Sequence, residues 1–82
     1  MAQPTKRTPT KLARSAQRLA ANVRLLRQDA NLSQRELATA ADVRQALVSD
    51  IERGDANPTL ESLVKIADAL GVDLTRLFDG SQ

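Results

Sequence analysis

The sequence predicts an all-α fold of five helices, and its composition, apolar spacing and capping residues all support this class. Ala and Leu supply 13 and 12 residues, whereas Val and Ile together supply only 7, a balance that favours helix over sheet. Apolar residues recur three and four positions apart, as on one face of an α-helix. The helices are expected over about 11–30, 33–41, 44–53, 59–70 and 73–78.

The first expected helix carries one apolar stripe. The stripe consists of Leu12, Ala16, Leu19, Val23, Leu26 and Ala30. Asn31 suits the position just after this helix, because Asn tolerates a left-handed backbone. The second helix begins with a capping box, in which the Ser33 hydroxyl accepts from the Glu36 amide and the Glu36 carboxylate accepts from the Ser33 amide.

Helix-terminating and helix-capping residues predict the bounds of the later helices. Gly54 and Gly71 suit the left-handed position that follows a helix. Thr59 is expected to cap the fourth helix, and Asp73 the last. We expect one small domain over 11–79, preceded by a flexible basic arm over 1–10 and followed by a tail over 80–82.

The composition excludes several classes of function. The chain has no Cys and no His, so it lacks thiol chemistry, the commonest metal ligand and the commonest general base. Its carboxylates are scattered, and no Gly-rich phosphate loop follows a strand. We therefore expect no enzymatic activity, no catalytic residues, no metal, no cofactor and no evident small-molecule ligand. The sequence also has neither a bilayer-spanning apolar run nor a secretory signal, which predicts a cytoplasmic protein without a membrane partner.

The charge is distributed unevenly. Residues 1–28 hold seven basic and no acidic residues, whereas residues 29–82 hold five basic and ten acidic residues. A basic N-terminal third favours a polyanionic partner. A solubilising tail on an ordinary helical domain is the alternative.

Two short helices joined by a tight turn, over 33–41 and 44–53, form a helix-turn-helix arrangement. An α-helix fits the major groove of B-DNA, where side chains at its N-terminal end reach base edges. Arg can pair with guanine, Gln with adenine, and an Ala methyl can pack on a thymine methyl. The residues expected to contact base edges are Arg44, Gln45, Ala46 and Ser49.

Residues 32–38 (Leu-Ser-Gln-Arg-Glu-Leu-Ala) and 43–54 (Val-Arg-Gln-Ala-Leu-Val-Ser-Asp-Ile-Glu-Arg-Gly) resemble the phage-repressor/Cro type of helix-turn-helix protein, also called the xenobiotic-response-element family. Residues 57–60 and 69–72 continue the match, which extends over about 19–78. As a small chain, it also resembles the stand-alone controller proteins of restriction–modification systems.

This resemblance implies a compact five-helix repressor-like domain that binds operator DNA, usually as a homodimer. It also implies a buried ion pair between Arg27 and Glu52, which would orient the third helix. The residues that it implies near the sugar–phosphate backbone are Ser33, Gln34, Leu47, Arg53 and Asn57.

Three acidic residues depart from the family pattern. Asp42 occupies the turn where the family usually has Gly, so we expect a left-handed turn at some cost in strain. Asp50 and Asp55 put negative charge beside the proposed DNA face. Asp50 can accept from a cytosine amino group, pair with a neighbouring Arg, or repel DNA.

Our hypothesis is a sequence-specific transcriptional regulator that binds double-stranded DNA as a homodimer on a two-fold symmetric operator. A small domain gains from association, and Leu74, Leu77 and Phe78 near the C-terminus are the expected dimer contacts. Two alternatives remain: an antitoxin paired with a toxin, and a protein-interaction module, which Asp50 and Asp55 favour.

Overall fold

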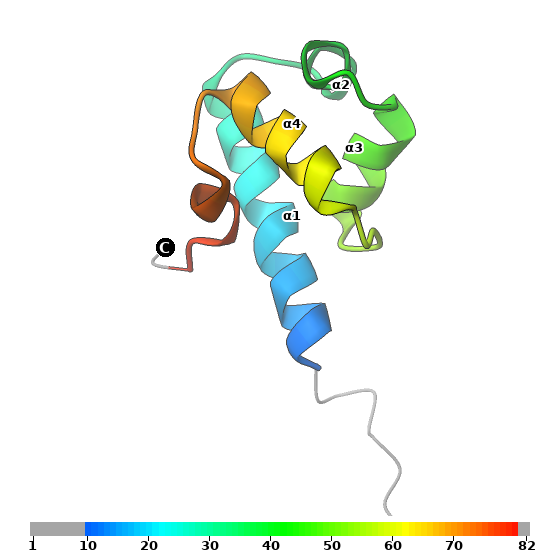
Figure 1. Cartoon of the computed structure of the whole chain (residues 1–82), viewed down its shortest axis with the longest axis vertical. Helices are drawn as coiled ribbons and strands as arrows, with labels where there is room; N and C mark the ends of the chain where they lie inside the picture. The colour runs from blue at the N-terminus through cyan, green and yellow to red at the C-terminus, as the bar shows by residue number, and fades with distance from the viewer. Residues whose placement is uncertain (1–9, 81–82) are drawn as a thin grey trace, which may run out of the picture.

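The computed structural model describes residues 10–80 of the chain, which form four α-helices and one 3₁₀ helix (Figure 1). No strand occurs within this range. The elements, in chain order, are α1 (Lys11–Asp29), α2 (Gln34–Ala41), α3 (Gln45–Arg53), α4 (Leu60–Leu70) and η1 (Leu74–Phe78). The all-α class is therefore confirmed. Positions 1–9 of the predicted arm and 81–82 of the predicted tail lie outside the described residues.

The prediction of a fifth α-helix is wrong, because Leu74–Phe78 is a 3₁₀ helix. Asp73 caps it, and the Arg76 amide donates to the Asp73 carbonyl at 2.9 Å, an i to i+3 bond. Five residues are too few for an α-helical ladder of any length, and short helical segments commonly adopt the tighter 3₁₀ winding.

The helix starts follow the capping residues. The Ser33 hydroxyl accepts from the Glu36 amide at 3.0 Å, and the Glu36 carboxylate accepts from the Ser33 amide at 2.8 Å, which completes the predicted capping box. The Thr59 hydroxyl accepts from the Ser62 amide at 3.0 Å at the start of α4. These local bonds satisfy amides that the helices themselves leave unpaired.

A left-handed residue makes the tight turn between α2 and α3. Asp42 has φ 56° and ψ 48°, as its place in the turn predicts. The Val43 amide donates to the Ala38 carbonyl at 3.0 Å, and the Asp42 amide donates to the Thr39 carbonyl at 3.2 Å. These two bonds close the C-terminus of α2 and set the direction in which α3 leaves it.

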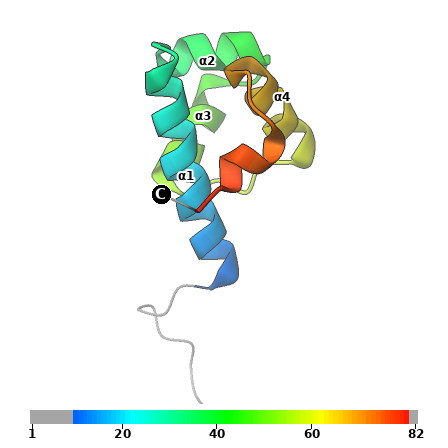
Figure 2. The ribbon, with the colours of Figure 1, turned by 90° about the vertical axis from the view of Figure 1, so that its left-hand side faces the viewer.

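The core lies where α1, α2, α3, α4 and η1 meet. Helix α1 packs against α3 and η1, while α2 packs against α3 and α4. The N-terminal half of α1 projects beyond this body in both views (Figures 1 and 2), and Leu12 there is 64% exposed. None of the described helices is both long and apolar enough to span a membrane.

Asn22 joins α1 to the end of η1. Its side chain is buried, and its Nδ2 donates to the carbonyls of Leu77 at 3.0 Å and Asp79 at 2.8 Å. Buried polar groups are costly unless they are hydrogen-bonded, so Asn22 favours the one position of η1 in which both carbonyls reach it. The sequence analysis did not single out this residue.

Leu77 lies in the core of a single chain rather than on its surface. Its exposed fraction is 0%, whereas Leu74 and Phe78 are partly buried at the edge of the core. Because η1 turns this side chain inward, Leu77 has no exposed surface in the single chain, and a dimer contact there stays an untested prediction. Only Leu74 and Phe78 of the predicted set retain surface for a partner.

We expect Leu77→Ala to lower the free energy of unfolding by about 2–5 kcal/mol, because it leaves a cavity in a closed core. Thermal or urea unfolding measures the loss, which should be the same at low and high protein concentration. Leu12→Ala, at an exposed position, is the control and should change stability by less than about 0.5 kcal/mol. A loss that disappears on dilution would instead place Leu77 in a contact between chains.

Candidate nucleic-acid interface

The leading end of α3 faces solvent. Val48 and Ile51 bury one side of the helix in the core, whereas Arg44, Gln45 and Ala46 are exposed at its start. Arg44 occupies the N-cap position, and no side-chain hydrogen bond caps the helix there. The first turn of α3 therefore presents three side chains to solvent, on a helix whose opposite side is buried in the core.

Ser49 and Arg53 continue this exposed face toward the C-terminus of α3. Arg53 Nη1 donates to the Ser49 hydroxyl at 2.8 Å. The same guanidinium forms ion pairs with Asp50 and, through Nε at 3.3 Å, with Asp55. Of the three roles considered for Asp50, the chain without DNA shows the ion pair with a neighbouring arginine, Arg53.

Glu52 sits on the opposite, buried side of α3 and pairs with Arg27 of α1. Arg27 Nε lies 2.6 Å from Glu52 Oε2, and Arg27 Nη2 lies 3.0 Å from Glu52 Oε1. The two side chains are 14% and 3% exposed. This two-pronged contact fixes α3 against α1 in one orientation.

Four further contacts extend this ion pair. Arg27 Nη1 donates to the Leu32 carbonyl at 2.8 Å, and Gln34 Nε2 donates to Glu52 Oε1 at 3.0 Å. Arg24 Nη2 donates to the Glu52 backbone carbonyl at 2.8 Å, and Arg24 Nε lies 3.8 Å from Glu52 Oε1. One carboxylate thereby joins α1, the start of α2 and the end of α3.

Arg24 was missed as a member of this network. The available signal was its spacing, because residues three apart on a helix share a face, and Arg24 precedes Arg27 by three positions. That spacing alone does not distinguish an arginine that pairs from one that points into solvent.

The network lowers the pKa of Glu52. Burial by itself raises this pKa, but the hydrogen bonds from Arg27 and Gln34 and the charges of Arg27 and Arg24 outweigh it. The hydrogen bond with Glu52 likewise raises the pKa of Arg27. Both side chains are therefore held in their charged forms.

The predicted backbone-contacting residues differ in their surroundings. Ser33 uses its hydroxyl as the α2 cap, and Gln34 turns its amide group toward Glu52. Leu47 is partly buried against the core, and Asn57 is exposed in the loop between α3 and α4. At the start of α2, the capping box already uses the amides of Ser33 and Glu36.

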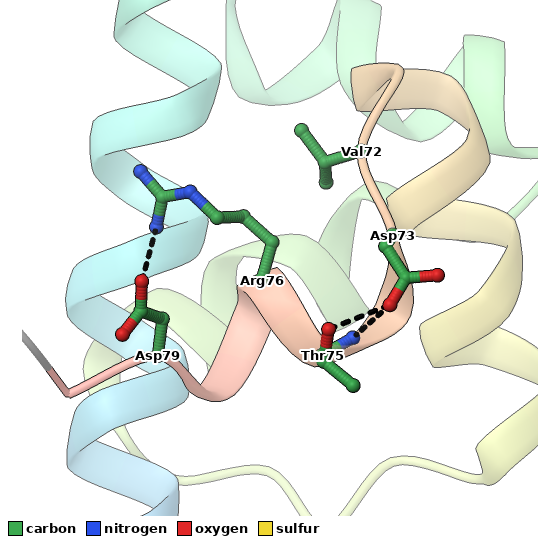
Figure 3. Close-up of a pocket in the computed structure, with 5 residues that line it drawn as sticks. All are labelled: Val72, Asp73, Thr75, Arg76 and Asp79. Carbon is green, nitrogen blue, oxygen red and sulfur yellow. Dashed lines mark hydrogen bonds and ion pairs between the residues drawn. The ribbon is translucent and has the colours of Figure 1, made fainter.

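An open hollow of about 580 Å³ lies beside η1, away from α3 (Figure 3). Its polar groups pair with one another: Asp73 accepts from the amide and hydroxyl of Thr75 at 3.2 and 2.6 Å, and Arg76 lies 3.9 Å from Asp79. Within residues 10–80, no cluster of His, Cys, Asp or Glu is suited to hold a metal ion.

A family model described as helix-turn-helix matches residues 23–77, which include α2, the turn and α3. The chain belongs to the helix-turn-helix family. It is 36% identical over 63 residues to the HTH-type transcriptional regulator DdrOP3 of Deinococcus deserti, a match that covers 77% of this chain and 49% of the relative. It is 45% identical over 49 residues to the control protein C.BamHI of Bacillus amyloliquefaciens, which covers 60% of each.

A solved structure extends this similarity to the fold. The restriction–modification controller protein C.AhdI of Aeromonas hydrophila superposes with a TM-score of 0.74 at 32% identity, over 77% of this chain and 96% of that one. The resemblance stated from the sequence is therefore confirmed at the level of the family. The chain spans about half to three-fifths of the length of the two curated relatives given above.

We expect Glu52→Gln to lower the free energy of unfolding by about 3 kcal/mol at pH 7, because it leaves the Arg27 guanidinium without its counter-charge. The pKa of Glu52 is lowered from 4.5, so its contribution is complete above that pH and is lost as the pH falls below it. Urea unfolding from pH 7 to pH 2.5 should show a smaller acid-induced loss in the variant than in the wild type.

Glu61→Gln is the matched control, because Glu61 is an exposed glutamate on α4 whose side chain is 80% exposed. It should follow the wild-type curve closely. Equal pH dependence in the wild type and Glu52→Gln would contradict a stabilising role for this carboxylate.

Proposed function

We propose that the chain is a sequence-specific, DNA-binding transcriptional regulator that acts as a homodimer on a two-fold symmetric operator. The observation that carries this proposal is the exposed leading end of α3, which is held from behind by the core and by the Arg27–Glu52 pair. The names of the relatives as transcriptional regulators and control proteins support it. Such a protein acts where the DNA is, in the cytoplasm, and needs no enzymatic activity or cofactor.

In this proposal α3 enters the major groove. Arg44, Gln45 and Ala46 would face base edges, with Ser49 one turn further along. Ser33 and Gln34, at the positive end of α2, would lie beside a phosphate. Leu47, Arg53 and Asn57 would lie along the sugar–phosphate wall.

The homodimer would use the surface near the C-terminus. Leu74 and Phe78 are the predicted contacts that remain partly exposed, and a two-fold arrangement would set half-sites about 34 Å apart. The projecting half of α1 is a separate basic surface. Its exposed Lys11, Arg14 and Arg18 form no ion pair within the described part of the chain. The start of α1 lies at the end of this helix away from α2 (Figures 1 and 2).

Selection of bound duplexes from a random pool tests the proposal directly. We expect a consensus with two inverted half-sites centred about one helical turn apart, which reports both base recognition and a symmetric dimer. Binding should weaken steeply as salt rises, because phosphate contacts release counterions. Failure to enrich any sequence, together with affinity that is absent or insensitive to salt, would favour the protein-interaction alternative, whereas co-purification with a second small protein would favour the antitoxin alternative.

Substitution of Gln45 tests the orientation of α3. Gln45→Ala should weaken binding to the selected operator by about 1–3 kcal/mol and leave random-duplex affinity nearly unchanged, because it removes a base contact but no charge. Fluorescence anisotropy at two salt concentrations measures both affinities. Gln17→Ala, an exposed glutamine on the projecting half of α1, is the control; a uniform loss on all duplexes would argue against base reading by Gln45.

A further inference from the structure

Arg53 is surrounded by acceptors of its own chain on the exposed face of α3. Each guanidinium nitrogen has its own acceptor: Nη2 donates to the Asp50 carboxylate, Nε to the Asp55 carboxylate and Nη1 to the Ser49 hydroxyl. Two carboxylates around one guanidinium leave this end of α3 with an excess negative charge. A DNA phosphate that approaches Arg53 must therefore compete with groups that already accept from it.

These contacts are exposed enough to exchange. The Arg53, Asp50 and Asp55 side chains are 56%, 44% and 65% exposed. Ion pairs in such surroundings are weak because water screens them, whereas an arginine–phosphate contact can be two-pronged and charge-assisted. A phosphate can thus take Arg53 from the carboxylates, which frees Asp50 at the same moment.

Asp50 is placed to use that freedom. It lines a shallow hollow together with Arg44, Ala46 and Leu47, so it shares the surface of α3 that carries the expected base-contacting residues. A freed carboxylate is an acceptor only, and the major groove offers it one matching donor on a cytosine edge, the N4 amino group. Opposite a guanine edge, which presents two acceptors, the same carboxylate would be repelled.

We propose that Asp50 is a specificity-determining residue that exchanges partners with Arg53: on DNA, Arg53 moves to a phosphate and Asp50 moves to a cytosine amino group. This inference rests on the proposed function and deepens it. At a site with cytosine in register, both members of the pair find new partners. At other sequences the carboxylate stays unpaired beside DNA, so it selectively weakens non-specific binding.

Duplex selection with Asp50→Asn tests the exchange. Asparagine can pair with adenine through its amide group, so one position of each half-site should change from cytosine to adenine. Asp50→Ala should lose the preference at that position and bind random duplex roughly three- to fivefold more tightly at low salt. For this variant, the ratio of operator to random affinity should fall roughly tenfold.

Asp55→Ala is the matched control, because it removes the other carboxylate on Arg53 from the loop that follows α3. It should raise operator and random affinity by similar factors and leave the consensus unchanged. In an Arg53→Met background, the gain from Asp50→Ala on random duplex should be smaller but should persist, because the carboxylate then has no partner to give up but still repels DNA. Thermal unfolding of each variant verifies that it is folded.

The outcomes separate this inference from the proposed function. If the wild-type chain selects no duplex, both fail. If it selects an operator but Asp50→Asn and Asp50→Ala select the same bases as the wild type, Asp50 does not read DNA and the exchange is overturned. The exchange would also be overturned if Asp50→Ala, like Asp55→Ala, raised operator and random affinity by the same factor. Asp50 would then only repel DNA of any sequence.

Discussion

The buried carboxylate of Glu52 is the constraint on which the placement of α3 depends. This carboxylate accepts from Arg27 of α1 through both oxygens and from Gln34 at the start of α2. Arg24 donates to the backbone carbonyl of Glu52. Burying a charge is costly unless strong partners replace water, so these contacts stabilise one arrangement and penalise those that separate them. Val48 and Ile51 on the apolar side of α3 pack into the core and hold the helix against it. The Arg27–Glu52 ion pair fixes the orientation of the helix.

Local sequence features predicted the parts of the fold that depend on local physics. The capping box at Ser33, the cap at Thr59 and the left-handed turn at Asp42 need only a few neighbouring residues, and all three are present. The last segment, residues 73–78, was predicted as a helix from its apolar spacing, and this spacing is compatible with both an α-helix and a 3₁₀ helix. Its short length and the cap at Asp73 favour the 3₁₀ form, a distinction that periodicity over five residues does not resolve.

The candidate site was less predictable because its contacts join residues distant in the sequence. The side chains of Arg24 and Gln34 resemble solvated surface groups until the fold brings Glu52 beside them, 28 and 18 positions away. Asn22 lies 55 positions from the Leu77 carbonyl that it binds. For Leu77, the sequence did not distinguish a core position from a dimer contact, since an apolar residue near the end of a domain suits both; its side chain is fully buried in the single chain.

The buried and exposed sides of α3 have different roles when the helix recognises a surface. Ordering the backbone of one residue costs about 1–2 kcal/mol, so ordering a nine-residue helix on contact would outweigh base contacts worth about 1–3 kcal/mol each. The buried side avoids that cost, because folding has already ordered the backbone. On the exposed side, the ion pairs of Arg53 are weak enough to be replaced by contacts with a partner. Adjustment to the partner therefore involves side chains only, and it costs little free energy.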